Sequence, residues 1–445
     1  MLALCEEWFT GLMLLYLSSG LTGFLAGDSP FNVWRVEDNP LLLAIQTGMY
    51  AVTLGFVVLH WRKFTSGVRA GGWVLALALL ALVSTLWSSD PDFTFRRSLV
   101  VIATTIFGIY FGSRYELPRQ VRLLGWTFLI LAVLSAACAL LLPQYGIDNQ
   151  LHRSNWQGIL GQKNLLGKAM AVGAIVLWAA KGVLPRVVRI AGLSLCAVLM
   201  LMSGSMAALL VFAPLLLLAL GYRALRARLP TLVPLAVVFL AMAAGLVFLA
   251  AGNSPLLLAS LGRDVTLTRR TEIWSAVWSA ISSHMVLGYG FSGFWAGIHG
   301  ESARVAATLG FVPRHAHNGF LDLWLELGMA GLFLFVAGYL QAVGNGVKLV
   351  RMSQDQLATW PLQYLAFLLL YDLVEGPILR QNNLYWALYA AIVVSVAQAA
   401  RCGQQLKAAC PMYLLEHPEQ QPGDLPRRTP GRLGELHPEA GRSAA

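Results

Sequence analysis

The chain has 445 residues, of which 57% are hydrophobic and only 12% are charged. A soluble protein of this length needs far more polar surface to cover itself, so the composition excludes that class. A net charge of +10 would suit a nucleic-acid-binding protein, but the basic residues lie in short clusters between apolar runs. Such clusters are typical of membrane proteins, whose orientation they determine. The five cysteines have neither metal nor disulfide spacing, and we assign them no function.

The apolar runs predict about twelve transmembrane helices, because each run is long enough to cross a hydrocarbon core of about 30 Å. The first run follows Glu6 and Glu7 and has no basic segment or small-residue cleavage site, which predicts a retained span and not a signal peptide. From residue 403 onward Pro, Gly, Arg and Glu dominate and predict a disordered cytoplasmic tail, 403–445. The predicted fold is therefore all-α, a polytopic transmembrane helix bundle. Its spans are expected near 8–26, 40–61, 71–88, 97–113, 124–143, 164–181, 187–203, 205–221, 231–252, 317–343, 357–375 and 381–400.

The loop charges predict the orientation of these spans in a bacterial inner membrane. With the N-terminus in the cytoplasm, every inward loop is basic, whereas the first outward loop, 27–39, holds three acidic residues against Arg35 alone. The positive-inside rule then places both termini in the cytoplasm. The basic residues of the inward loops are Arg62, Lys63, Arg69, Arg114, Arg119, Arg122, Lys181, Arg186, Arg189, Arg223, Arg226, Arg228, Lys348 and Arg351.

A second set of basic residues is left on the outer side, where it works against the orientation signal. Anionic lipid or surface ion pairs are the better explanation for any one of these residues. They do not explain the group, which predicts a cationic site at the outer face. The group consists of Arg96, Arg97, His152, Arg153, Lys163, Arg263, Arg269, Arg270, Arg304, Arg314 and Arg380.

The predicted outer loop 253–316 is too long to be a simple connection, which indicates a function. Within it, apolar residues at helical spacing over 271–283 predict an amphipathic helix. That helix either lies at the membrane surface, with its tryptophans among the headgroups, or packs on the bundle. The glycines of 288–293 permit a tight turn or a close backbone approach.

The loop ends in Arg314, His315, His317 and Asn318 at the start of the tenth predicted span. Further into that span, Asp322 and Glu326 are four residues apart and share one helix face. Acidic residues at this depth are costly unless they meet cations, so we favour pairing with the outer arginines over direct chemistry. Two histidines without a visible third ligand make metal binding the less favoured interpretation.

Three segments of this region resemble the O-antigen ligase and polymerase superfamily: residues 262–274, the turn 287–291, and the His-Ala-His-Asn motif of 315–321. Upstream, residues 158–167, with Lys163 and Asn164, and residues 87–97 are similar to segments of the same superfamily. The resemblance covers most of the chain from about 85 to 340, in the same order.

This resemblance implies a GT-C-like membrane glycosyltransferase whose active site faces the periplasm. It also implies an inverting, metal-independent reaction without a cofactor, in which a glycan moves from undecaprenyl diphosphate to a sugar hydroxyl. The residue types suit that chemistry, because arginine forks bind phosphate oxygens and can replace a metal. Histidine titrates in the range that a general base requires. The expected partners are the lipid-linked donor, a glycan or lipid A-core acceptor and the bilayer, with a chain-length regulator and a flippase as further candidates and no nucleic acid.

By position in the motifs, the resemblance makes His317 the candidate catalytic base and His315 the second choice. Arg270 is the first choice for contact with the diphosphate, although Arg269 stands where the superfamily often has glycine, so either arginine could do this work. Asn318 either orients the histidine or caps the tenth helix. Weaker diphosphate candidates are Lys163, Arg96 and Arg97, and further supporting candidates are Arg314, Trp274 and Glu326.

Three functions remain open on the sequence. Met206 follows Ser203-Gly204-Ser205 where lipopolysaccharide ligases place an arginine, which favours a polymerase of exopolysaccharide or O-antigen repeat units. A ligase that attaches the glycan to lipid A-core is the alternative. An anion or lipid-linked-substrate transporter is less favoured, because there is no internal repeat or pair of broken spans. Charged residues are also sparse at mid-membrane, where a transport path requires them, and Lys168 and Asp372 are the possible exceptions.

Overall fold

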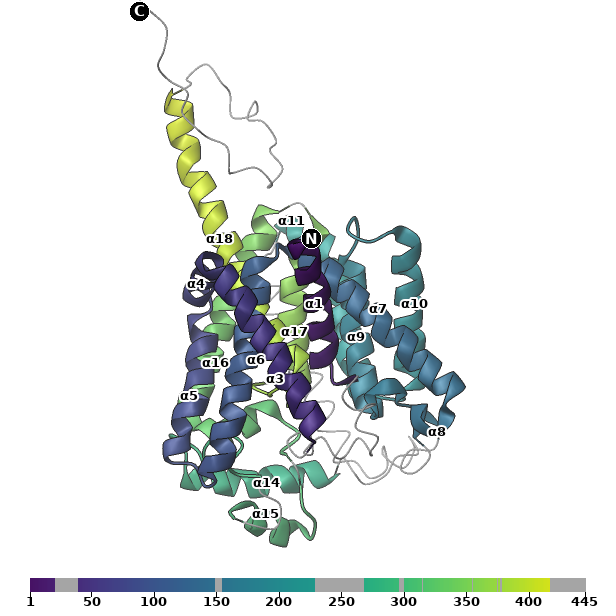
Figure 1. The fold of residues 1–445 in the computed structure, drawn as a ribbon, viewed down its shortest axis with the longest axis vertical. Helices are drawn as coiled ribbons and strands as arrows, with labels where there is room; N and C mark the ends of the chain where they lie inside the picture. Colours follow the sequence, from purple (N-terminus) through teal and green to yellow (C-terminus); the bar gives the residue numbers. More distant parts are fainter. Residues whose placement is uncertain are drawn as a thin grey trace, which may run out of the picture. The chain divides into compact units, whose positions relative to one another are not determined.

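The computed structural model describes most of the chain, and the described part is almost entirely helical. The contacts divide the chain into two units, residues 1–400 and 401–445. Figure 1 shows the helices of the first unit packed side by side as a bundle. The described residues are 1–20, 39–148, 154–228, 268–295, 300–313, 315–353, 355–373, 375–376 and 378–416.

Every predicted span except 231–252, which lies outside the described residues, overlaps a helix. The helices of the N-terminal half are α1 (Leu2–Leu17), α3 (Pro40–Leu59), α4 (Trp61–Ala70), α5 (Gly72–Val83), η2 (Ser84–Leu86), α6 (Pro91–Arg114), α7 (Leu117–Leu141), α8 (Pro143–Gly146), η3 (Gly158–Leu160), α9 (Lys163–Ala179), α10 (Arg186–Met202) and α11 (Met206–Arg228). Those of the C-terminal half are α14 (Thr268–Ser283), α15 (Ser302–Leu309), α16 (Gly319–Met352), η5 (Gln356–Thr359), α17 (Trp360–Asp372) and α18 (Leu384–Glu416). Two short strands, β1 (Ile147–Asp148) and β2 (Asn155–Trp156), pair antiparallel.

Local sequence explains where the long helices begin. Asn39 and Asp90 cap α3 and α6, and each is followed by proline at the first helical position. Asn318 caps α16, where its side-chain oxygen accepts from the backbone N–H groups of Phe320 and Leu321 at 3.0 and 3.2 Å. Of the two roles considered for Asn318, helix capping is the one that the structure shows.

Five of the described helices are long and apolar enough to cross a membrane: α3, α6, α7, α16 and the Leu384–Arg401 part of α18. A sixth candidate is the pair formed by α4 and the segment Gly72–Leu86, bent by 86°. The protein is therefore a multi-pass helical membrane protein, and the count of about twelve spans stays a prediction.

The centre of the bundle is formed by α6, α9, α17 and α18. Aromatic side chains fill it, with Trp360, Tyr364, Tyr371 and Trp386 all fully buried. Helices α6 and α18 approach closely at Gly108, where a Cβ atom would lie only 2.5 Å from the carbonyl oxygen of Ala387. Small residues at such crossings let membrane helices pack backbone to backbone.

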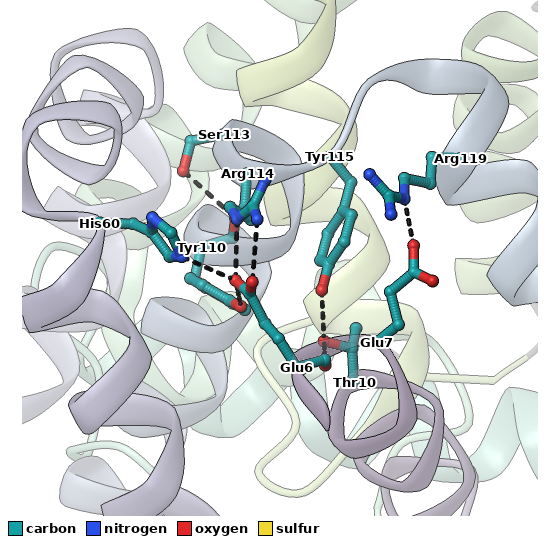
Figure 2. A network of polar contacts seen from close by, with 9 residues as sticks. All are labelled: Glu6, Glu7, Thr10, His60, Tyr110, Ser113, Arg114, Tyr115 and Arg119. Carbon is teal, nitrogen blue, oxygen red and sulfur yellow. Dashed lines mark hydrogen bonds and ion pairs between the residues drawn. The ribbon is translucent and has the colours of Figure 1, made fainter. Parts of the chain in front are cut away.

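A buried glutamate joins three helices at the N-terminal end of the bundle (Figure 2). Glu6, with 2% of its side chain exposed, accepts two hydrogen bonds of 2.8 Å from Arg114 and one of 2.6 Å from Tyr110. His60 lies 3.0 Å from the same carboxylate. Glu7 pairs with Arg119 beside it. This cluster satisfies the acidic residues ahead of the first apolar run and fixes α1 against α4 and α6.

Helices α14 and α15 lie at the end of the bundle away from the N-terminus (Figure 1). The apolar face predicted for 271–283 is buried through Ile273, Val277 and Ile281 against Phe294 and neighbouring residues. The apolar face of this helix therefore packs on the protein. Of its two tryptophans, Trp278 is half exposed. The burial of three apolar side chains favours this arrangement over a helix lying free among lipid headgroups.

Several helices differ from the predicted boundaries, and two of the differences lie in the C-terminal half of the chain. The long helix α16 contains a break at Gly328, whose φ of +64° is left-handed and whose α-carbon faces the backbone of Val286 with no room for a side chain. Helix α18 continues to Glu416, past residue 403 where the tail was predicted to begin. Residues 401–416 still hold helix-forming Gln, Leu, Lys and Ala, and the rest of the predicted tail lies outside the described residues.

Candidate active site

The candidate site lies where α14, the segment before α16, and the segment between α17 and α18 meet. A carboxylate stands at its centre. The Oε1 atom of Glu375 is 3.9 Å from a guanidinium nitrogen of Arg270, and its Oε2 atom is 3.6 Å from Nδ1 of His317. Arg270 and His317 were the first choices from the sequence for diphosphate contact and for the catalytic base. Both lie close to the carboxylate of Glu375, which stands between them.

His315 lies against His317, with ring centroids 4.0 Å apart. The backbone N–H of His317 donates to Nδ1 of His315 at 3.2 Å, so Nδ1 is an acceptor and the ring proton belongs on Nε2. Burial, followed by the charges of His317 and Arg380, lowers the pKa of His315 to about 3. His315 is therefore neutral at pH 7 and offers a hydrogen-bond donor to the site.

Glu375 is held ionised by its neighbours. Burial by itself would raise the pKa of Glu375, but the nearby His317, His315 and Arg270 outweigh burial and lower it to about 2. A fixed negative charge beside Nδ1 of His317 favours the tautomer that leaves Nε2 as the acceptor. At 3.6 Å the contact is an ion-pair distance rather than a hydrogen bond, and such contacts often shorten when substrate binds.

The backbone between the two histidines is fixed from both sides. The N–H of Ala316 donates to Oδ1 of Asp322 on α16 at 2.9 Å, and its carbonyl accepts from Nε1 of Trp274 on α14 at 2.9 Å. His317 itself has a left-handed φ of +53°. Non-glycine residues adopt that conformation only where their surroundings impose it, and it aims the ring toward Glu375.

The segment that carries Glu375 docks on the start of α16. The carbonyl of Glu375 accepts from the N–H of Gly319 at 3.1 Å, and Arg380 lies 3.6 Å from Oδ2 of Asp322. A side chain at 319 would overlap Asp372, so glycine is required for this close approach. The pairing of Asp322 with an outer arginine, favoured on the sequence, is confirmed by its contact with Arg380.

Two of the motifs that resembled the superfamily interlock at the edge of this site. The N–H of Ser89 donates to the carbonyl of Tyr289 at 3.1 Å, and the hydroxyl of Thr94 donates to the carbonyl of Phe291 at 2.7 Å. The N–H groups of Tyr289 and Gly290 in turn donate to carbonyls of α16 just before its break at Gly328. The glycine turn therefore joins α14 to the bundle, and its role is structural.

The other predicted cations divide into three groups. Arg97 is buried over the ring of Phe93, and its charge acts on the carboxylate of Glu326, the supporting residue proposed on α16. Arg96 is exposed on α6, and Lys163 is partly exposed at the first position of α9. The side chain of Arg269 and all of Arg314, Arg263, His152 and Arg153 lie outside the described residues.

A lysine that the sequence did not rank for this site lies beneath it. Lys168 is 6% exposed, and its Nζ is 4.9 and 4.5 Å from the ring centroids of Tyr371 and Tyr385. Lys168 interacts electrostatically with both Glu375 and Asp372. Lys168 and Asp372, noted on the sequence as possible mid-membrane charges, are both buried and interact electrostatically with one another.

Glu375 was missed because it falls at the end of the predicted span 357–375, where no site residue was sought. The signal that could have found it is an acidic residue directly before Gly376-Pro377, in the short segment between two apolar runs. With His315 and His317 it supplies three potential ligand atoms within 4.8 Å of one another, a set that could hold a metal ion. The guanidinium of Arg270, close to the same carboxylate, opposes a cation there.

Comparison with known proteins relates part of this chain to a known family. Residues 191–336 match the family model described as O-antigen ligase, a range that includes Arg270, His315 and His317 but ends before Glu375. The chain is also 26% identical to the exopolysaccharide production protein ExoQ of Rhizobium meliloti (strain 1021), over 322 residues that make up 69% of this chain and 72% of the relative. Residues 191–336 are therefore similar to the O-antigen ligase family, and the apolar helices of the described chain are those of a multi-pass membrane protein.

Proposed function

We propose that the protein is a membrane glycosyltransferase that joins glycan repeat units at the periplasmic face of the bacterial inner membrane. The donor is a glycan on undecaprenyl diphosphate, and the acceptor is a hydroxyl group of another sugar. The observation that carries this proposal is the Glu375 carboxylate between Arg270 and His317, because one cluster then supplies a cation for the diphosphate and an oriented base.

In the proposed reaction, Nε2 of His317 accepts the proton of the acceptor hydroxyl. That oxygen then forms a bond to the anomeric carbon of the donor, on the side opposite the diphosphate. The bond between the anomeric carbon and the diphosphate oxygen breaks, so the product is inverted and undecaprenyl diphosphate leaves with the electron pair. Glu375 stabilises the protonated imidazole as charge develops on it, as the carboxylate does in a catalytic triad.

Arg270 has the charge and shape for the leaving group. Its guanidinium presents forked donors that match diphosphate oxygens, and it stays protonated at any physiological pH. The neutral His315 would donate from Nε2 to the same oxygens or to the acceptor. These fixed donors would stabilise the charge that grows on the leaving diphosphate without a metal ion.

The periplasmic location is supported by the separation of charges along the bundle. The basic residues Arg114 and Arg119 pair with Glu6 and Glu7 at the N-terminal end of the bundle (Figure 2), the end that the positive-inside rule assigns to the cytoplasm. Helices α14 and α15 lie at the other end of the same unit (Figure 1). A polymerase is preferred to a ligase because Met206 replaces the ligase arginine and because a relative is an exopolysaccharide production protein.

The test is His317→Ala in cells that lack the chromosomal copy of this protein. We expect high-molecular-weight polysaccharide to disappear while the variant remains in the membrane at the normal level. His60→Ala is the matched control, since His60 also faces a glutamate but at the opposite end of the bundle. Polymer of normal amount and length from His317→Ala would overturn the proposed base, and inhibition of the wild-type enzyme by EDTA would overturn the metal-free reaction.

The second candidate is a ligase that transfers a finished glycan to lipid A-core, favoured by the family description of residues 191–336. The lipid-linked intermediates of the deletion strain separate the two functions. A polymerase leaves single repeat units on the lipid, whereas a ligase leaves full-length chains on it. The second pattern would replace the polymerase with the ligase and leave the chemistry of the site unchanged.

A further inference from the structure

A cleft of about 630 Å³ lies between α14 and α15, apart from the cluster around Glu375. Its volume is that of a pocket for a small molecule or for a few sugar rings. One wall is the face of α14 that carries Ser275, Ser279 and Ser283, and the opposite wall includes Arg304 and Thr308 of α15. No residue of the cleft has a role in the reaction proposed above.

The serines form a row because residues four apart share one face of a helix. Arg270, Trp274 and Val277 lie on the other side of the same helix, toward the bundle. Helix α14 therefore presents the diphosphate candidate on one face and the cleft on the other, about 10–12 Å apart, which is one helix diameter. A long substrate that reaches the site can pass around the helix to the cleft.

The lining has the chemistry of a site for a polyhydroxylated ligand. Ser275 and Ser279 are exposed and form no side-chain hydrogen bond to any residue in the part of the chain that the structure describes, so their hydroxyls are available as donors and acceptors. Glu272 and Arg304 add a charged acceptor and a charged donor at the rim. Ala276 and Val305 supply apolar surface for the C–H faces of a sugar ring.

Other ligand classes fit this lining less well. A site for a phosphate or a lipid headgroup requires several cations, but the cleft is lined by one basic residue, Arg304, and two acidic residues, Glu272 and Glu301. A site for a lipid tail requires a continuous apolar surface, and the row of serines interrupts the apolar surface of this cleft. The mixture of neutral hydroxyls, one arginine and two carboxylates matches the hydroxyl groups of a carbohydrate.

We propose that this cleft binds sugar units of the glycan substrate that are not themselves reacting, and so holds the chain while its end lies at His317. This inference rests on the proposed function and adds a second substrate-binding position to it. Binding of distant units would add affinity without new chemistry at the reaction centre, because the second contact forms within an already bound molecule.

The experiment uses Ser279→Phe, which fills the cleft from the middle of the serine row. Ser282→Phe is the control, because Ser282 is exposed on the same helix, bonds only to the carbonyl of Trp278 and does not line the cleft. Both changes are made in the full-length protein with His317→Ala, so that binding is measured without turnover. The probe is the oligosaccharide fraction released by mild acid from the polysaccharide of the host cells, and calorimetry in detergent measures its affinity.

We expect Ser279→Phe to weaken oligosaccharide binding at least tenfold and Ser282→Phe to leave it unchanged. In cells with His317 intact, Ser279→Phe should shorten the polymer rather than abolish it. Equal binding by the two variants would overturn the cleft assignment, while loss of polymer in His317→Ala would still support the proposed function. Recovery of a partner protein on the cleft, with no oligosaccharide binding to the parent protein, would likewise overturn it in favour of a protein-docking surface.

Discussion

Replacing Glu375 by Gln removes one negative charge from between Arg270 and His317 and leaves the size of the side chain unchanged. The backbone bond from Gly319 to the carbonyl of residue 375 does not depend on the carboxylate, so the segment should keep its position. The expected loss is therefore electrostatic. His317 would no longer be held in the tautomer that exposes Nε2, and its protonated form would lose its partner.

The geometry gives the size of this loss. Two unit charges 3.6 Å apart interact by about 4.6 kcal/mol at an effective dielectric constant of about 20. The side chains of His317 and Glu375 are 35% and 18% exposed, so solvent screens part of this energy and about 1.5–3 kcal/mol should remain in the transition state. That range corresponds to a rate lower by roughly 10- to 150-fold.

The assay is the rate of polymer formation in membrane vesicles loaded with the lipid-linked donor, at equal amounts of protein. Glu7→Gln is the matched control, because it also removes a carboxylate paired with an arginine but at the far end of the bundle, and it should keep the normal rate. A normal rate for Glu375→Gln, or an equal fall in both variants, would refute the role given to Glu375.

Two further predictions concern stability and are measured by thermal unfolding in detergent. Gly319→Ala should lower the free energy of unfolding by about 1–3 kcal/mol, because the new methyl group overlaps Asp372. The control is Gly344→Ala on the same helix, whose methyl group meets no atom within 4 Å and should leave the free energy of unfolding unchanged. Equal melting temperatures for the two variants would contradict this packing. His315 has a folded pKa of about 3 against about 6.5 unfolded, so below pH 6.5 the unfolded state binds the extra proton and stability should fall from pH 7 toward pH 4. His315→Asn should flatten this dependence, and an unchanged slope in that variant would assign it to other groups.

The sequence predicted the elements better than it predicted their contacts. Runs such as 97–113 and 124–143 overlap most of α6 and α7, because a helix that crosses a membrane must satisfy its backbone hydrogen bonds internally and be apolar over a fixed length. The helical face over 271–283 was also predicted correctly from its 3.6-residue period. Whether that face met lipid or protein was left open, since both surfaces are apolar.

Within the site, the sequence ranked His317 and Arg270 because both lie in recognisable motifs close to one another. It placed Asp322 among the arginines, since an acidic residue inside a span needs a cation. The sequence did not predict Glu375 or Lys168 as site residues. Each is an isolated charged residue near an apolar run, and no neighbouring motif distinguishes it from a residue that anchors a helix end.

What the sequence determined by itself is the class of protein, the positions of its helices and the groups available for chemistry. All three follow from local composition, period and motif. The tertiary structure decided which of those groups meet. Residues 270, 317 and 375 come from three separate segments, which contacts such as Gly319 to the Glu375 carbonyl and Trp274 to the Ala316 carbonyl bring together. The same packing set the two faces of α14, one toward the bundle and the other toward the cleft beside α15, because burial of a helix face depends on which neighbour covers it.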